Sequence, residues 1–194
     1  MKQPGLAPDR AMSHRHAISS WEINHKNSSV GFSVEQFNLV SKPFKSVKGE
    51  FQVYSGAMQA VSEDFNESKI DFSVVVGSIY TGNDRRDRHL RSSAFFNAQQ
   101  FPSMKFRSVA FIKVADNRFI LEGDLSIRGL SRRILFDVTQ EPFQHELNGQ
   151  SVQFKITGNL NRLDFGIKGT ALSEIFIGKE VSISIQLEFL KQQL

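Results

Sequence analysis

The sequence predicts an all-β fold, either an antiparallel barrel or a sandwich of two sheets. Apolar and polar residues alternate along most of the chain, as they do in strands that have one buried and one exposed face. Turn-forming residues separate these segments, namely Asp116-Asn117, Gly129 and Asn148-Gly149. No long segment has the spacing of an amphipathic helix, and the pattern amounts to about eight strands.

The first half of the chain contains three alternating segments. They lie around residues 30–34, 47–53 and 70–76, and the third alternates most regularly. Gly49 lies in phase with the apolar residues of the second segment, where it can bend the strand or let a ligand approach the backbone. Residues 55–68 are rich in polar side chains and predict a loop.

The second half contains five further alternating segments. They lie at residues 104–111, 119–127, 134–138, 152–156 and 181–189. In the first of these, Met104 and Phe106 lie in one phase, whereas Val109 and Phe111 lie in the other. This change of phase predicts a β-bulge near residues 107–108.

Residues 78–107 do not alternate. A turn and a helix N-cap signal occupy residues 81–84, and Pro102 ends any helix that begins there. Four arginines, two aspartates and His89 crowd into residues 84–91. We interpret the segment as a long charged connection with one or two short helical turns that holds one end of the fold in shape.

Five motifs give the chain a family resemblance. The motifs are Trp21-Glu22-Ile23 with Ser28-x-Val30-x-Phe32-x-Val34; Val47-Lys48-Gly49-Glu50-Phe51; Arg86-Asp87-x-His89-Leu90-Arg91-Ser92 with Phe95-Phe96 and Phe101-Pro102-x-Met104-x-Phe106-x-Ser108; Gly123-x-Leu125-x-Ile127-Arg128-Gly129; and Asn161-Arg162-x-Asp164-Phe165-Gly166-Ile167. In this order, over about residues 20–190, they resemble the YceI-like family of lipid-binding proteins. The chain departs from the family pattern at Asn24 and Ala94, where Asp is usual, and at Gln36, where His is common.

The resemblance implies a lipocalin-like, eight-stranded antiparallel β-barrel with an elongated apolar pore and one long loop that contains a short helix. It therefore selects the barrel over the sandwich. Members of the family bind polyisoprenoid chains, such as isoprenoid quinones or prenyl pyrophosphates. A long-chain isoprenoid lipid is accordingly the expected ligand of this chain, and no other cofactor is expected.

Length and composition fit one domain. The chain has 194 residues, of which 40% are hydrophobic and 18 are phenylalanine, while Trp and Tyr are rare. This balance favours a dry interior. We expect residues 1–19, which show no periodicity, to form a flexible tail, and residues 20–194 to form one lipid-binding β-barrel domain.

Charge and residue usage limit the partners and the compartment. A net charge of +4 allows transient contact with an anionic membrane surface but does not indicate nucleic acid. There is no cysteine and no apolar run of about 18 residues, so neither a disulfide nor a membrane-spanning helix is expected. Residues 1–16 lack the apolar core of a secretory signal, so we expect a cytoplasmic protein, or a periplasmic one if the native N-terminus is missing. The sequence leaves open whether the protein forms a homodimer.

The pore, if present, is lined by inward-facing residues of the alternating segments. These are Val30, Phe32, Val34, Phe51, Val53, Ile70, Phe72, Val74, Val76, Phe106, Leu121, Phe136, Val138, Phe154, Ile183 and Ile185. The arginines of the central segment are candidates for an anionic head group, because a guanidinium group binds phosphate through two hydrogen bonds. These candidates are Arg85, Arg86, Arg88 and Arg91. Alternatively, they pair with Asp84 and Asp87 and with backbone carbonyl oxygens, and so hold the loop.

The sequence gives no clear sign of an enzyme or a metal site. It contains no Gly-x-Ser-x-Gly motif, and its five histidines are scattered. The leading hypothesis is a protein that binds an isoprenoid lipid for transport, storage or sequestration. Two alternatives remain: an enzyme that acts on a small apolar substrate through the loop around His89, and a barrel that is filled by its own side chains.

Overall fold

Eleven β-strands form one antiparallel sheet in the structure, a computed structural model that describes residues 18–38, 42–142, 150–170 and 176–193. The strands are β1 (Ser19–Ile23), β2 (Ser29–Asn38), β3 (Lys42–Phe51), β4 (Tyr54–Ala60), β5 (Lys69–Val75), β6 (Ile79–Tyr80), β7 (Ser103–Ala115), β8 (Arg118–Ile127), β9 (Leu130–Glu141), β10 (Ser151–Asn161) and β11 (Ile177–Lys191). The helix α1 (Asp84–Arg91) and three short 3₁₀ helices, η1 (His25–Asn27), η2 (Val76–Ser78) and η3 (Arg162–Phe165), complete the described elements.

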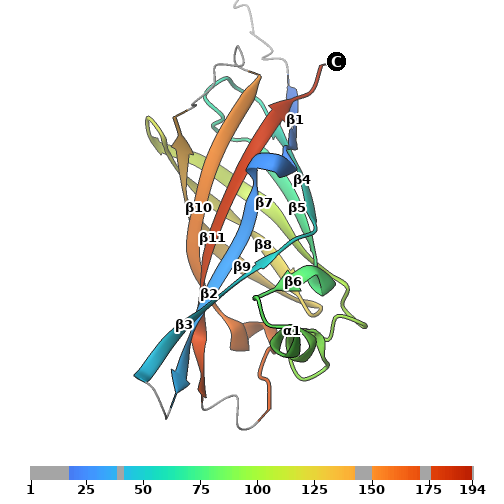
Figure 1. The fold of residues 1–194 in the computed structure, drawn as a ribbon. Helices are drawn as coiled ribbons and strands as arrows, with labels where there is room; N and C mark the ends of the chain where they lie inside the picture. The colour runs from blue at the N-terminus through green and yellow to red at the C-terminus, as the bar shows by residue number, and fades with distance from the viewer. Residues whose placement is uncertain (1–17, 39–41, 143–149, 171–175, 194) are drawn as a thin grey trace, which may run out of the picture.

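Eight of the strands close into a barrel, which confirms the predicted fold (Figure 1). Their order is β1-β4-β5-β7-β8-β9-β10-β11, and β11 returns to β1. The C-terminal end of β11 pairs with β1, whereas its earlier residues pair with β2. The wall that β1 begins is therefore continued by β2 after the break at η1.

The break at η1 depends on a buried carboxylate. Glu188 on β11 accepts hydrogen bonds from the side-chain amides of Asn24, at 2.6 Å, and Asn27, at 2.7 Å. Asn24 also caps η1. An aspartate at position 24, which the family pattern led us to expect, would put a second carboxylate against Glu188. Asparagine instead supplies an amide N–H group that donates to this carboxylate.

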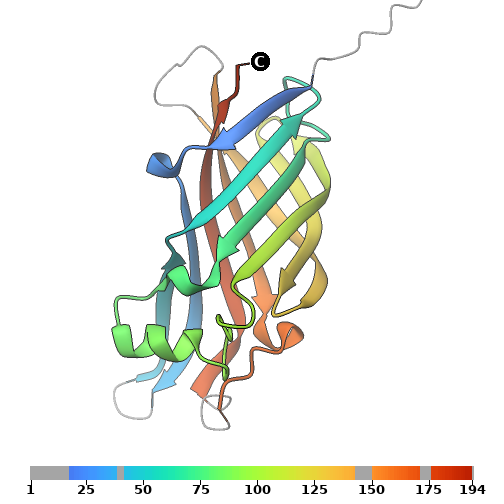
Figure 2. The same ribbon diagram turned by 90° about the vertical axis from the view of Figure 1, so that its right-hand side faces the viewer.

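One side of the barrel is completed by a helix in place of strands. Among the described residues, β3 pairs with β2 along its length but with β6 only at Glu50 and Phe51. The segment with α1 lies beside β6 at this end of the barrel (Figures 1 and 2). Asn83 caps α1 by accepting the N–H of Arg86 at 3.0 Å, which stabilises the first turn. The predicted charged connection is thus a short helix that covers a gap in the sheet.

Aromatic side chains fill the opposite end of the barrel. Phe111 and Phe119 stack at 4.6 Å, and Phe154 meets both rings edge-on at 5.7 and 5.8 Å. Phe65 and Phe189 extend the cluster. We call these five residues the aromatic plug. All five side chains are buried, so this end is closed by packed rings.

Eight of the eleven strands follow the predicted alternating segments, whereas β1, β4 and β6 were not among them. The register of β7 shifts between Ser108 and Ala110, which confirms the predicted bulge. The predicted loop at residues 55–68 is wrong in its first part, because β4 continues to Ala60. The inward residues Met58 and Ala60 are buried, but polar outward neighbours hide the alternation. The predicted turn at residues 148–149 and residues 1–17 of the predicted tail lie outside the described residues, and β1 begins at Ser19.

Candidate functional site

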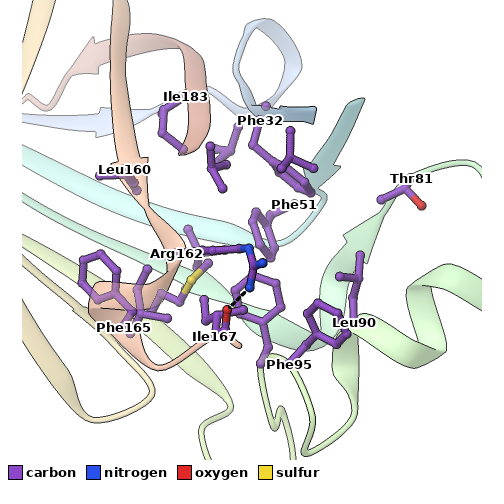
Figure 3. A pocket seen from close by; sticks show the side chains of 18 of the residues that line it. Phe32, Phe51, Thr81, Leu90, Phe95, Leu160, Arg162, Phe165, Ile167 and Ile183 are labelled. Atoms are coloured by element: carbon purple, nitrogen blue, oxygen red, sulfur yellow. Dashed lines mark hydrogen bonds between the residues drawn. The ribbon is translucent and has the colours of Figure 1, made fainter. Parts of the chain in front are cut away.

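A cavity of about 930 Å³ lies inside the barrel, between α1 and the aromatic plug. Its wall is mostly apolar because β-strands turn alternate side chains inward, and the inward phase of these strands is aliphatic or aromatic. Figure 3 shows labelled side chains from β2, β3, β10, β11 and the α1 segment around one common space. The cavity reaches the surface where exposed residues of α1 line it, and we call this opening the mouth.

Twelve of the sixteen residues predicted to line a pore do line this cavity. They are Val30, Phe32, Val34, Phe51, Ile70, Phe72, Val74, Phe106, Leu121, Phe136, Ile183 and Ile185. Alternation placed them on one face because the period of two assigns every second residue of a strand to the same face. That they contact a lipid stays a prediction.

The other four predicted lining residues lie elsewhere. Val53 is 53% exposed, because β3 ends at residue 51 and the chain turns before β4. Val76 is buried but begins η2, where the strand periodicity stops. Val138 and Phe154 are buried beside or within the aromatic plug. Alternation gives the face of a strand, but it does not tell which part of that face is filled.

The four predicted head-group arginines separate into two pairs. Arg85 and Arg88 are exposed, line the cavity at its mouth, and make no hydrogen bond or ion pair with the described residues. Arg86 also lines the cavity, but its guanidinium donates to the hydroxyl and carbonyl oxygens of Thr81 at 2.7 and 2.8 Å. Arg91 does not line the cavity and donates to the carbonyl oxygen of Asp87 at 3.1 Å. Only the first pair is available to a ligand in the described structure.

The carboxylate of Asp87 holds α1 to the residues that precede it. Asp87 is 1% exposed and accepts hydrogen bonds from the hydroxyl of Thr81 at 2.5 Å and from its backbone N–H at 3.3 Å. Since Thr81 also accepts from Arg86, its hydroxyl joins both charged groups. The motif residues 86 and 87 therefore position the helix. Among the described residues, no ion pair joins the arginines to Asp84 or Asp87, and Thr81 and backbone carbonyl oxygens are the partners instead.

Arg162 is the most buried cation of the cavity wall. It is 5% exposed, and its guanidinium donates to the carbonyl oxygens of Ile167 at 2.5 Å, Lys168 at 2.9 Å, Ile177 at 3.0 Å and Gly178 at 2.9 Å. Figure 3 shows this side chain reaching toward Ile167 across the end of the cavity. Arg162 thereby ties the segment after η3 to the start of β11.

Several lining residues lie outside the strands and were missed. They are Leu90, Phe95, Phe96, Phe165 and Ile167. No alternation marks these positions, so only their place in the sequence motifs could have indicated a role. Arg128 helps to hold two of the segments together, because it donates to the carbonyl oxygens of Phe95 and Gly166, both at 2.6 Å.

Among the residues that the structure describes, the polar groups of the site do not form a recognisable catalytic arrangement. His89 packs edge-on against Phe95 at 4.9 Å, and no hydrogen bond joins it to Asp87 in the described structure. Among the described residues, no group of three His, Cys, Asp or Glu side chains could hold a metal ion. Within the same residues, no helix has the length and apolar character needed to cross a membrane.

Comparison with protein families gives a match over most of the chain. The model of the YceI-like domain matches residues 21–189. A UPF0312 protein of Staphylococcus aureus strain bovine RF122 is 29% identical over 177 residues, which cover 89% of this chain and 98% of the relative. Another, from strain MSSA476, is 30% identical over 179 residues, with the same coverage.

Solved structures share the fold. BcnA of Burkholderia cenocepacia aligns with a TM-score of 0.72 and 20% identity, covering 86% of this chain and 98% of BcnA. A YceI protein of Campylobacter jejuni aligns with a TM-score of 0.69 and 23% identity over all of both chains. A polyisoprenoid-binding domain of Saccharophagus degradans aligns with a TM-score of 0.67 and 13% identity, covering 89% of this chain and 98% of the domain.

Proposed function

The chain belongs to the YceI-like family, and we propose that it binds a long-chain isoprenoid lipid inside the barrel, for transport, storage or sequestration. The head group would be a pyrophosphate or a quinone. The observation that carries the proposal is the apolar cavity of about 930 Å³. A similar fold in a polyisoprenoid-binding domain supports it. The cavity also argues against a barrel filled by its own side chains.

The cavity volume sets the scale of the ligand. An apolar protein cavity of about 150 Å³ holds one benzene molecule. The volume of 930 Å³ therefore holds about six groups of that size, or roughly 35 carbon atoms. A chain of several isoprene units matches this volume, whereas a small apolar metabolite would leave most of it empty.

Binding would depend on burial, without any chemical step. Each buried methylene contributes about 0.8 kcal/mol relative to water. A lipid tail in a membrane is already out of water, so its transfer into the barrel changes the free energy much less. Exchange with a membrane can then be reversible, and polar contacts at the mouth would favour one head group over another. Arg85 and Arg88, which pair with none of the described residues and line the mouth, are our candidates for such contacts.

The test has two parts. Mass spectrometry of an organic extract of the purified protein should detect a polyisoprenoid. Val74 lies on β5 with a buried side chain that lines the cavity. Val74→Trp should place an indole ring in the space that the ligand occupies, so bound lipid per protein should fall sharply while the thermal midpoint changes little.

The neighbouring residue provides a matched control. Val75 is 43% exposed and does not line the cavity, so Val75→Trp adds the same ring outside the barrel and should leave lipid content unchanged. A lipid-free wild type, together with a strongly destabilised Val74→Trp variant, would contradict the proposal. Overpacking a filled core costs about 1–3 kcal/mol, and that loss would indicate that the space is not free.

A further inference from the structure

Four glycines on the inner wall are each covered by a phenylalanine ring from a neighbouring strand. A β-carbon added at Gly49 would lie 2.5 Å from Cζ of Phe32, and one at Gly158 would lie 2.7 Å from Cδ1 of Phe136. The other two pairs are Gly56 with Phe72 and Gly123 with Phe106. We call these eight residues the glycine–phenylalanine belt.

Within each half of the barrel, the belt follows the register of the strands. Gly49 pairs with Phe32, which pairs with Ile183, which pairs in turn with Gly158. On the other side, Gly56 pairs with Phe72 and Phe72 with Phe106. The rings of Phe106 and Phe136 lie 5.8 Å apart and join the two halves. The belt is therefore a nearly continuous circuit of the inner wall.

Space explains the glycines of the belt, and backbone conformation does not. None of the four has a positive φ, so other residues could adopt their backbone conformations. Glycine also weakens a strand, because it leaves nothing to pack. Here the missing side chain leaves room for a ring: all four phenylalanines line the cavity, and none of the four glycines does. The rings thus lie over the backbone of the wall.

Residues that line the cavity lie on both sides of the belt. On the side of the aromatic plug, the wall consists of residues such as Val30, Ile70 and Leu187. On the side of the mouth, Val34 and Val181 continue it. A lipid chain that enters at the mouth must pass the belt before it reaches the inner part.

We propose that the glycine–phenylalanine belt controls the length of isoprenoid chain that the cavity accepts. It determines whether the end of a long chain reaches the inner part. The inference rests on the proposed function, because it concerns the same ligand. With the rings flat over the glycines, the passage is open and long chains bind fully. Any change that pushes a ring inward shortens the chain that fits but leaves the outer part unchanged.

The sharpest perturbation is Gly158→Ala. Its new methyl group would meet the ring of Phe136, while the nearest backbone atom, the carbonyl oxygen of Leu135, is 3.4 Å away. The wall lies behind this ring and Phe106 lies beside it, so the ring must move into the cavity. Exclusion of only two terminal carbons from the inner part already weakens binding about tenfold.

The assay offers an equimolar mixture of farnesol, a short isoprenoid alcohol, and solanesol, a long one, to the delipidated protein. Native mass spectrometry measures the ratio of bound long chain to bound short chain. Gly158→Ala should lower this ratio about tenfold, with farnesol binding retained. Gly77→Ala is the matched control, since a β-carbon there meets no atom within 4 Å, and its ratio should equal that of wild type.

Two further variants keep the test decisive. Gly158→Ala combined with Phe136→Leu removes the displaced ring and should restore the wild-type ratio. If Gly158→Ala does not fold, Gly49→Ala replaces it, because the three atoms nearest its β-carbon belong to the side chains of Phe32 and Thr81. An unchanged ratio, or equal loss of both alcohols, would overturn only the proposed role of the belt in selecting chain length. Failure of the wild type to take up either alcohol would overturn the proposed function and, with it, the proposed role of the belt.

Discussion

Arg162→Leu should destabilise the protein strongly, although it places an apolar residue in an apolar wall. The wild-type guanidinium donates four hydrogen bonds to backbone carbonyl oxygens at 2.5–3.0 Å, at a site where the residue is 5% exposed. Each hydrogen bond to a charged group contributes about 1.5–3 kcal/mol, but such values do not add fully. Removal of one partner from a buried charged network typically costs about 3–5 kcal/mol, and we expect a loss in that range.

The measurement is urea denaturation, which gives the free energy of unfolding from the midpoint and slope. Arg133→Leu is the control, because Arg133 pairs with Asp124 and Glu122 on the surface, where such pairs contribute about 0–1 kcal/mol. Hydrogen exchange should also increase at the amides of residues 166–170 in the Arg162 variant. A loss below about 1 kcal/mol would refute the argument that Arg162 holds the end of the cavity.

Two further predictions concern the mouth and alkaline pH. Arg85→Ala or Arg88→Ala should weaken binding of geranylgeranyl diphosphate by about 1–3 kcal/mol in a direct titration but leave geranylgeraniol unaffected, and equal losses for both would indicate collapse of the loop. Burial, and then the charge of Glu50, raise the pKa of Tyr54. The unfolded chain releases this proton from about pH 10 upward while the folded protein retains it, so stability falls there. Tyr54→Phe loses a 2.7 Å hydrogen bond to Ser28, costing about 0.5–1.5 kcal/mol at neutral pH. Its urea midpoint should then fall less than that of wild type above about pH 10, and parallel curves would refute this.

The central segment shows what a motif conveys without its structure. Its arginines and aspartates indicated either a head-group site or a braced loop. The structure shows the bracing contacts of some of these residues, and the head-group site stays a prediction. Arg86 and Asp87 brace the helix through Thr81, whereas Arg85 and Arg88 point to no described partner. Residues that are neighbours in the sequence have different surroundings because successive residues of a helix point in directions about 100° apart.

The sequence by itself determined the strands, their inward faces and the bulge in β7. These features follow from local periodicity, since a strand that slips by one residue would turn all its apolar side chains to water. It also identified most of the cavity wall through the same period. Three strands, β1, β4 and β6, were not among the predicted segments. In β4, polar outward residues obscured the inner face that Met58 marks.

Only the tertiary structure decided which part of the interior is packed and which is open. Phe154 and Phe136 are both inward-facing residues of regular strands, yet the first fills the plug and the second lines the cavity. The difference depends on which residue of another strand lies opposite, for example Gly158 beside Phe136. Such partners are distant in sequence and become neighbours only when the barrel closes, so no local pattern can reveal them.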